Sequence, residues 1–332
     1  MWSTYTPLGL DIGNFSVKFA QIKTSPFSKQ RFVSFAITPV KDDSSRDKII
    51  EAIKTSYKEL AGDSKNVNIS ICGSNIITRY IILPRIGNRD LRKALEFELE
   101  KYIPYKKEDM VIDYNKLTNL PNNKTLVLFV ATERRFIQER VNLVKDAGLQ
   151  PKSINIDALA LNETFKALPY KSKGAVAVLD IGYKLSKLIV LENDVPYLSR
   201  DIESGEYNII QATAKRMGID FQKAKEVAYK ADENLGEIAK VITYDARSLL
   251  DELLMSFEYC ERTLEKKVSQ LYLTGGGSRN KILLESLKRT QNLKIDFLDI
   301  TQSLKFYSSL NSEELKEKSY LLAVAIGLAL QK

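Results

Sequence analysis

Residues Leu8–Ile22 read LGLDIGNFSVKFAQI, and residues Ala177–Leu191 read AVLDIGYKLSKLIVL. Each stretch is an apolar strand that ends in Asp-Ile-Gly, followed by a short polar turn and a second alternating strand. Asp11 and Asp180 hold equivalent places in the two copies. One such motif is a weak signal. Two copies in matching settings, one in each half of the chain, predict a duplicated α/β domain.

A third glycine-rich turn lies near the C-terminus, where Leu271–Asn280 reads LYLTGGGSRN. Gly275, Gly276 and Gly277 follow an apolar strand and precede a helix that begins near Asn280. They leave no side chain between the backbone and a flat base or ribose, so we expect this turn to bind adenosine. A G-x-G-x-x-G dinucleotide interpretation fails on spacing and on position in the chain. The alternative is a flexible turn at a helix N-terminus.

The first Asp-Ile-Gly turn carries groups that suit the phosphates of a nucleotide. Gly13 lets the backbone approach closely, and successive N–H groups around Asn14 can form an anion-binding concavity. Ser16 adds a hydroxyl donor, and Lys18 a cation for the β- and γ-phosphates. An aspartate at the strand end, such as Asp11, can hold Mg²⁺ through water. For one copy alone, the alternative is a plain β-hairpin with an Asp-x-Gly turn.

Other candidate residues have ordinary structural alternatives of similar or greater weight. Asp157 begins a predicted buried helix and can orient a water or a metal ion, which makes it the one candidate catalytic residue, but it can equally be a helix N-cap. Lys223 and Lys225 lie on a predicted helix and can reach a ribose or adenine edge. A solvated helix face is the favoured interpretation of these two lysines.

Composition bounds the remaining possibilities. The chain has 332 residues, enough for two or more domains, and a formal net charge of +8 with the charges interspersed. No basic helix with interleaved aromatic residues points to nucleic acid. The chain has no histidine, which excludes Ser/His/Asp, Cys/His and His-metal chemistry, and its two cysteines exclude a disulfide framework. No apolar run is long enough to span a membrane, and no secretory signal is expected.

Two long helices are predicted in the second half of the chain. Thr243–Lys266 has an apolar stripe at steps of three and four residues, and Ser312–Gln331 closes the chain. The second of these is strongly apolar toward its C-terminal end, so we expect it to be buried.

The chain resembles a known family at six stretches taken in order: LGLDIGNFSVKFAQI, ALEFELEKYIPYKKEDMVIDY, VATERRFIQERVNLVKDAGLQPKSINIDALAL, LDIG…VPYLSRDI, YLTGGGSRN and LLAVAIGLAL. Together they resemble the PilM family of actin-like type IV pilus assembly proteins, which is related to the division protein FtsA. The single motifs are shared with the wider actin, Hsp70 and sugar-kinase superfamily, whereas the combination is specific.

The resemblance implies an α/β, actin-like (ribonuclease H-like) fold of duplicated domains around a central nucleotide cleft. Four subdomains are implied: 1A from residues 1–83, 152–172 and the C-terminal helix 312–332; 1C from 84–151; 2A from 173–204 and 268–311; and 2B from 205–267.

The resemblance also implies ATP (or ADP) and Mg²⁺ as cofactors, with the metal held through water by Asp11 and Asp180. The nucleotide-binding residues carried over by motif are Asp11, Gly13, Asn14, Ser16 and Lys18 in the first loop, Asp180 and Gly182 in the second, and Gly275, Gly276, Gly277 and Asn280 in the third.

A membrane-protein partner is implied as well. In the family, a cytoplasmic N-terminal peptide of the bitopic protein PilN binds a groove between 1A and 1C, and Ile103, Val111 and Tyr114 are apolar residues that suit such a groove. The expected place is the cytoplasmic side of the inner membrane, reached through this partner, in pilus biogenesis and twitching motility. Other platform proteins and the cytoplasmic pilus ATPases are further expected partners. Neither nucleic acid nor direct membrane insertion is expected.

The second phosphate loop departs from the family pattern. Gly182–Ser186 reads GYKLS, where small residues and threonines are usual. Tyr183 and Leu185 crowd the approach of a γ-phosphate, although Lys184 can substitute as a cation. We therefore expect a nucleotide-binding scaffold with at most weak ATPase activity. Two alternatives are a small-molecule kinase, with Asp157 as its base, and an FtsA-like filament-forming division protein, whose basic membrane helix has no counterpart here.

Overall fold

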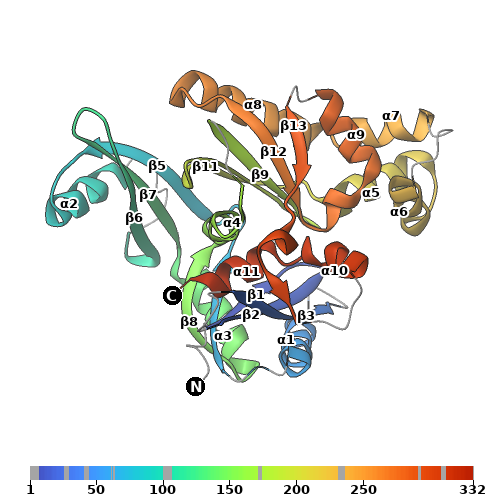
Figure 1. The fold of residues 1–332 in the computed structure, drawn as a ribbon, viewed down its shortest axis with the longest axis horizontal. Coiled ribbons are helices and arrows are strands. Elements are labelled where there is room, and N and C mark those ends of the chain that lie inside the picture. The colour runs from blue at the N-terminus through green and yellow to red at the C-terminus, as the bar shows by residue number, and fades with distance from the viewer. Residues whose placement is uncertain are drawn as a thin grey trace.

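The computed structural model describes residues 7–25, 30–40, 45–60, 62, 64–99, 107–170, 174–230, 236–290, 293–307 and 312–331. Within these residues the chain forms two large sheets, one above the other in Figure 1, and a smaller sheet that projects to one side. The predicted α/β composition is therefore confirmed.

The first large sheet has the strand order β14-β3-β2-β1-β4-β8. β1 pairs antiparallel with β2 and parallel with β4, and β4 pairs parallel with β8. The strands are β1 (Leu8–Ile12), β2 (Ser16–Thr24), β3 (Arg31–Pro39), β4 (Asn66–Ile71), β8 (Gln150–Ile156) and β14 (Lys305–Phe306).

The second large sheet repeats this plan with the order β11-β10-β9-β12-β13. β9 pairs antiparallel with β10 and parallel with β12, which pairs parallel with β13. The predicted duplication is thus present in the strand order as well as in the motifs. The strands are β9 (Ala175–Ile181), β10 (Ser186–Glu192), β11 (Val195–Ile202), β12 (Val268–Thr274) and β13 (Lys294–Phe297).

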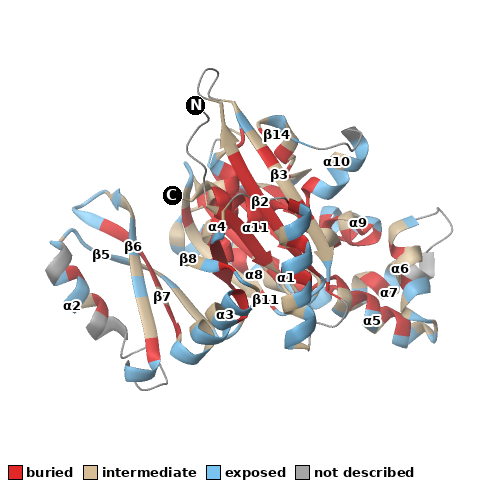
Figure 2. Ribbon diagram, turned by 90° about the horizontal axis from the view of Figure 1, so that it is seen from below, coloured by how far each residue is buried: buried red, intermediate tan, exposed pale blue. Residues whose placement is uncertain are grey.

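Two helices fill the space between the large sheets: α4 (Asp157–Lys166) and α11 (Ala323–Leu330). They share one apolar core with side chains from both sheets, and α11 is buried along almost its whole length (Figure 2). This close packing requires glycine. A Cβ on Gly9 of β1 would lie 1.9 Å from the carbonyl oxygen of Ala325, and a Cβ on Gly327 would lie 1.8 Å from that of Ala160.

The other helices cover the outer faces of the sheets. In the first half, α1 packs on β2 and β3, and α3 packs on α1 and β8; in the second, α8 packs on β10, β11 and β12. The bounds are α1 (Arg46–Leu60), α3 (Arg134–Asp146), α5 (Glu206–Met217), α6 (Phe221–Lys230), α7 (Gly236–Asp245), α8 (Arg247–Leu264), α9 (Lys281–Thr290) and α10 (Ser312–Ser319), with short 3-10 turns at Lys107–Asp109, Gly276–Arg279 and Ile300–Gln302.

Both predicted long helices are interrupted. Ala246 separates α7 from α8, and the segment 320–322 separates α10 from α11. The amide of Leu322 donates to the carbonyl of Ser319, so the chain turns and α11 enters the core in a new direction.

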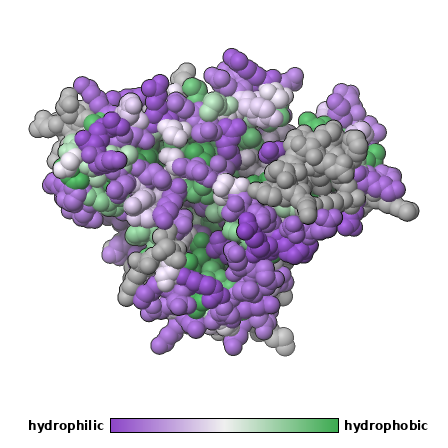
Figure 3. Space-filling model, turned by 180° about the vertical axis from the view of Figure 1, so that it is seen from behind, coloured by the Kyte–Doolittle hydropathy of each residue, from purple (hydrophilic) through white to green (hydrophobic). Residues whose placement is uncertain are grey.

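Within the described residues, no helix combines the length and the apolar composition needed to cross a membrane. Figure 3 shows one face of the surface, where hydrophilic side chains (purple) dominate and apolar ones (green) appear mainly in depressions.

The small sheet has the order β5-β7-β6, formed by β5 (Ile76–Pro84), β7 (Lys124–Glu133) and β6 (Met110–Leu120), and α2 (Asn88–Leu99) covers it. The predicted subdomain boundary at Pro84 cuts through this unit, because β5 pairs along its whole length with β7. At the other end, α3 and β8 pack with the first large sheet. A division by sheets therefore groups β5 with the small sheet, and α3 and β8 with the first large sheet. Ile103 lies outside the described residues.

Candidate functional site

A cleft of about 520 Å³ lies between the two halves of the molecule, where β1 and β9 end. The two Asp-Ile-Gly turns face each other across it, and the glycine turn after β12 lies at its edge. The structure therefore brings together three motifs that are far apart in the sequence. The predicted site residues that line this cleft are Asp11, Gly13, Asn14, Ser16, Lys18, Asp157, Asp180, Gly182, Lys184, Gly275 and Gly276.

The two Asp-Ile-Gly turns have the same local hydrogen bonding. The amide of Gly13 donates to the carbonyl of Ser16, and the amide of Gly182 donates to the carbonyl of Leu185, each at 3.1 Å. A Cβ on Gly182 would lie 2.5 Å from that same carbonyl oxygen, so glycine is required there for steric reasons. The altered sequence of the second turn has not changed this closing contact.

Five charged side chains meet at the base of the cleft. The Lys18 ammonium lies 2.9 Å from Asp11 Oδ2. The Lys187 ammonium lies 2.9 Å from Asp157 Oδ2 and 3.4 Å from Asp180 Oδ2. All of these side chains are largely shielded from solvent, at 13% exposure or less.

Burial and ion pairing oppose each other in this group. Burial acts to lower the pKa of Lys187, but the carboxylates of Asp157 and Asp180 outweigh it, and the pKa lies well above its usual value. Burial acts to raise the pKa of Asp157, but Lys187 and a hydrogen bond with Ser70 outweigh it, and that pKa is lowered. Burial raises the pKa of Asp180, with Asp11 adding to the effect. At neutral pH, Lys187 and Asp157 therefore form a charged pair that joins the two halves.

Lys187 was not among the sequence candidates, although the repeat contains it. Aligning the two copies places Lys187 on Lys18, and the pairing is the same: Asp11 stands opposite Lys18, and Asp180 opposite Lys187. Lys184, the predicted substitute cation, lies within the turn, whereas Lys187 lies on β10, the strand that follows it. Lys184 does line the cleft, but its side chain is exposed.

The glycine turn is held close to the second aspartate. Gly275 has φ of +84°, and a Cβ there would lie 2.2 Å from Asp180 Oδ1. Behind the turn, the Tyr229 hydroxyl donates to Glu206 and lies 3.1 Å from the carbonyl oxygen of Gly276. A neighbouring cavity of about 900 Å³ shares Gly275 and Gly276 with the cleft, so the space continues past the turn.

Three predicted site residues lie off the cleft. Asn280 is buried, and its Oδ1 accepts from the amide of Leu283, so it caps the start of α9. Gly277 packs beneath the turn, where a Cβ would lie 2.5 Å from Ile181. Lys223 is exposed on α6.

Lys225, one helical step from Lys223, points toward the cleft. Its ammonium lies 3.3 Å from Glu206 Oε1 and 5.5 Å from the centre of the Phe15 ring. Glu206 lines the cleft. Of Lys223 and Lys225, only Lys225 therefore contacts residues of the site.

Aromatic rings meet across the mouth of the cleft. The Phe15 ring of the first turn lies 5.0 Å from that of Tyr183 in the second. Tyr183 in turn contacts Tyr207, which contacts Phe221. The bulky residue expected to crowd the phosphates thus also links the two halves.

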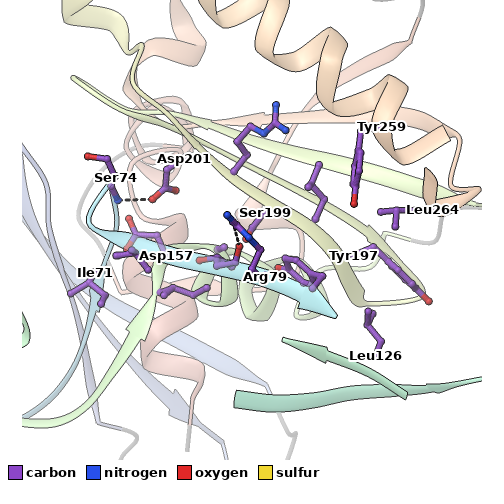
Figure 4. Close-up of a pocket in the computed structure, with 18 of the residues that line it drawn as sticks. Ile71, Ser74, Arg79, Leu126, Asp157, Tyr197, Ser199, Asp201, Tyr259 and Leu264 are labelled. Carbon is purple, nitrogen blue, oxygen red and sulfur yellow. Dashed lines mark hydrogen bonds between the residues drawn. The ribbon is translucent and has the colours of Figure 1, made fainter. Parts of the chain in front are cut away.

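A second cavity, of about 420 Å³, lies on the other side of Asp157 between the small sheet and the second half (Figure 4). It shares Gly73, Ser74 and Asp157 with the cleft. The amide of Gly73 donates to Asp201 Oδ2 at 2.5 Å, which ties the end of β4 to β11. The two cavities are therefore adjacent, and both lie against residues of the two halves.

A third cavity, of about 480 Å³, lies between β6 of the small sheet, α4 and the turn before β11. Apolar, amide and charged side chains line it, and we call it the β6–α4 groove. Its lining residues are Asn115, Lys116, Leu117, Asn155, Leu159, Asn162, Glu163, Lys166, Asp194, Val195, Pro196, Leu330 and Gln331. The predicted groove residue Tyr114 packs instead against Leu91 and Leu95 under α2, and Val111 is not part of this lining.

The charges present do not match a site for Mg²⁺. The carboxylates of Asp11 and Asp180, predicted to hold this ion through water, each face a lysine ammonium. In the described part of the chain, no three acidic, cysteine or histidine side chains are grouped to hold a metal ion. A hydrated Mg²⁺ between these carboxylates would lie beside ammonium groups of like charge.

Comparison with known families decides the assignment. Residues 9–332 match the family described as "Type IV pilus assembly protein PilM". The chain belongs to the PilM family. The resemblance identified from the six sequence stretches is thus confirmed over nearly the full length.

Solved structures agree on the PilM fold. The chain is similar to one described as "PilM-PilN type IV pilus biogenesis complex", with a TM-score of 0.83 and 24% identity, covering 98% of each chain. It is also similar to the ethanolamine utilization protein EutJ from Carboxydothermus hydrogenoformans (TM-score 0.57, 13% identity, 99% of this chain and 90% of that chain). A nucleotide-free diol dehydratase-reactivating factor matches at a TM-score of 0.54 and 8% identity, over 99% of each. The predicted actin-like fold is confirmed.

Proposed function

We propose that this member of the PilM family is a nucleotide-binding scaffold of the type IV pilus assembly platform. It binds ATP or ADP in the cleft and the cytoplasmic N-terminal peptide of a PilN-like membrane protein in the β6–α4 groove. The observation that carries the proposal is the convergence of two phosphate-type turns and a glycine turn on one cleft, in a chain of this family. The partner would hold the protein at the cytoplasmic face of the inner membrane.

The cleft supports a nucleotide with its phosphates between the two Asp-Ile-Gly turns. Lys18 approaches from one half and Lys187 from the other, so anionic oxygens between the turns meet a cation on each side. The adenosine end would lie along Gly275 and Gly276, where the space widens into the neighbouring cavity. The Gly275 conformation at φ +84° keeps this surface free of a side chain.

The geometry favours a scaffold over a kinase. A kinase needs a base to accept the proton of a substrate hydroxyl. Asp157 was the one candidate, but its carboxylate is held by Lys187 and its pKa is lowered, which makes it a poor base. The filament alternative gains no support from the C-terminal helix, because α11 is buried in the core rather than exposed as a membrane-binding surface.

The β6–α4 groove suits an extended peptide. Apolar side chains such as Leu117 and Leu159 can contact alternate side chains of a bound peptide strand. The amide groups of Asn115 and Asn155 can form hydrogen bonds with the backbone of that peptide. The groove lies between the small sheet, α4 of the first half and the turn before β11 of the second half. The small sheet also contacts β11 of the second half, so closure of the nucleotide cleft can change the width of this groove.

A peptide-binding experiment tests the scaffold function. The probe is the cytoplasmic N-terminal peptide of a PilN-like membrane protein, titrated with and without ATP. Leu159→Asp replaces one of the apolar lining residues of the groove with a charged one and is expected to weaken binding by at least about tenfold. Leu254→Asp on α8, an exposed position far from the groove, is the matched control and should leave affinity unchanged. Absence of peptide binding in both conditions would overturn the proposed scaffold.

A cysteine in the proposed nucleotide cleft allows nucleotide binding to be followed by chemical labelling. Cys72 lines it, and Cys260, the other cysteine, is fully buried. Burial, together with Asp157, raises the pKa of Cys72, so its reaction with iodoacetamide should be slow. We expect ATP or ADP at ten times its Kd to slow this reaction a further tenfold or so, since only the empty cleft is open to the reagent.

Intact-protein mass spectrometry measures that rate. Cys72→Ser is the control and should leave a folded protein that takes up no label. A labelling rate that saturating nucleotide does not change would contradict the proposed cleft.

A further inference from the structure

Each half of the molecule brings its own aspartate–lysine pair to the cleft. Asp11 and Lys18 are direct partners on β1 and β2, and Asp180 and Lys187 are direct partners on β9 and β10. The repeated spacing of seven residues thus places a lysine opposite each Asp-Ile-Gly aspartate. The two pairs differ in whether the lysine ammonium also contacts a carboxylate of the other half.

Lys18 stays with the aspartate of its own half, at 2.9 Å. Lys187 lies 3.4 Å from its own Asp180 and closer, at 2.9 Å, to Asp157 at the start of α4 in the other half. Its ammonium is therefore shared between two carboxylates that come from opposite sides of the cleft. The side chains of Lys187 and Asp157 are 12% and 5% exposed, so water screens this interaction poorly.

A divalent cation that joined the two halves would have to lie between the carboxylates of Asp157 and Asp180. Mg²⁺ requires near-octahedral oxygen ligands or its own bound waters, and it needs carboxylates that are not already neutralised. Here the carboxylate oxygens of Asp157 and Asp180 that face the cleft are within ion-pair distance of an ammonium on the chain itself. A metal ion beside Lys187 would face repulsion between like charges in a weakly screened site.

We propose that Lys187 is a built-in counter-cation that takes the place of the divalent metal ion, so that the cleft binds its nucleotide independently of Mg²⁺. The inference rests on the proposed nucleotide cleft and concerns its cofactor requirement. Phosphate oxygens between the two turns would accept hydrogen bonds from the ammonium groups of Lys18 and Lys187, each of which has three N–H donors. Tyr183 and Leu185, which narrow the second turn, leave less room there for a hydrated ion.

The first test uses the unmodified protein. Calorimetric titration with ATP, and separately with ADP, is carried out in EDTA and in excess Mg²⁺. We expect the two Kd values to agree within about threefold, and a Kd more than about tenfold weaker in EDTA would overturn the inference. Metal-dependent binding contradicts the inference alone. The absence of binding in both buffers contradicts the nucleotide cleft itself, and the inference with it.

Variants of Lys187 provide the second test. Lys187→Gln removes the ammonium and should make nucleotide binding at least about tenfold tighter in Mg²⁺ than in EDTA, because Asp157 and Asp180 are then free to attract a divalent ion. Lys187→Arg keeps the charge and should retain metal-independent binding. Lys223→Gln, at an exposed lysine that lies off the cleft, should also leave binding metal-independent.

Mn²⁺ alone, followed by electron paramagnetic resonance, separates a metal site from a general loss of affinity. We expect the Lys187→Gln protein to bind Mn²⁺ without nucleotide and the unmodified protein not to bind it. Stoichiometric, tight Mn²⁺ binding to the unmodified protein would overturn the inference. The comparison in EDTA and Mg²⁺ needs no variant, so a Lys187→Gln protein that fails to fold leaves the inference testable.

Discussion

Replacing Lys187 with methionine is expected to lower the free energy of unfolding by about 3–5 kcal/mol, because it removes one partner of a buried ion pair and leaves the other charge without compensation. Lys187 Nζ lies 2.9 Å from Asp157, which is 5% exposed, and 3.4 Å from Asp180. In the variant, both carboxylates would remain in the cleft beside Asp11. Urea denaturation at neutral pH, followed by circular dichroism, measures the change.

Two further variants separate the effect of the lost charge on stability from the effect of lost packing. The double variant Lys187→Met/Asp157→Asn removes both charges of the pair and should recover much of the lost stability. Lys184→Met, at an exposed lysine three residues away, should change stability by less than about 0.5 kcal/mol. A Lys187→Met protein within about 1 kcal/mol of the unmodified protein would show that the pair does not join the halves.

Replacing Gly327 with alanine is expected to cost about 3 kcal/mol, although alanine is the better helix former by about 1 kcal/mol. A Cβ at this position would lie 1.8 Å from the carbonyl oxygen of Ala160 and 2.4 Å from its carbonyl carbon. Both atoms belong to the backbone of α4, so no side chain can move aside. The helices α4 and α11 would have to separate, and with them the two large sheets they join.

Thermal unfolding of Gly327→Ala measures this cost, and nucleotide binding reports whether the cleft is also displaced. Gly87→Ala is the matched control, because the nearest atom to its Cβ is 3.9 Å away, at Asp90 Oδ2. It should change stability by less than about 1 kcal/mol. A Gly327→Ala protein as stable as Gly87→Ala would mean that α4 and α11 adjust their packing at little cost.

Most of the fold and part of the site were predictable from local patterns. The duplicated strand–turn–strand units, the glycine turn and the buried C-terminal segment follow from alternation, glycine spacing and apolar composition, and the structure contains all of them. Helix ends were less predictable. The interruption at Ala246 falls inside a continuous apolar stripe, and only the packing of α7 and α8 on different neighbours reveals it.

The site predictions included residues that lie off the cleft and omitted one that lies in it. Asn280 stands next to the glycine turn, but it caps the start of α9. Lys223 was expected to reach a ribose or adenine edge from its helix, but it is exposed on α6. Lys187 was left out because it lies on the strand after the turn. The repeat register places it opposite Asp180, so alignment of the two copies could have found it.

The sequence by itself determined the two aspartate turns, the glycine turn and the duplication that relates the halves, because each is a property of residues near one another in the chain. Only the tertiary structure decided which cation meets which carboxylate. Asp157 and Lys187 belong to different halves, and their ion pair depends on how α4 packs between the two sheets. That packing depends in turn on backbone contacts at Gly9 and Gly327, where the distance between elements is set by the absence of a side chain.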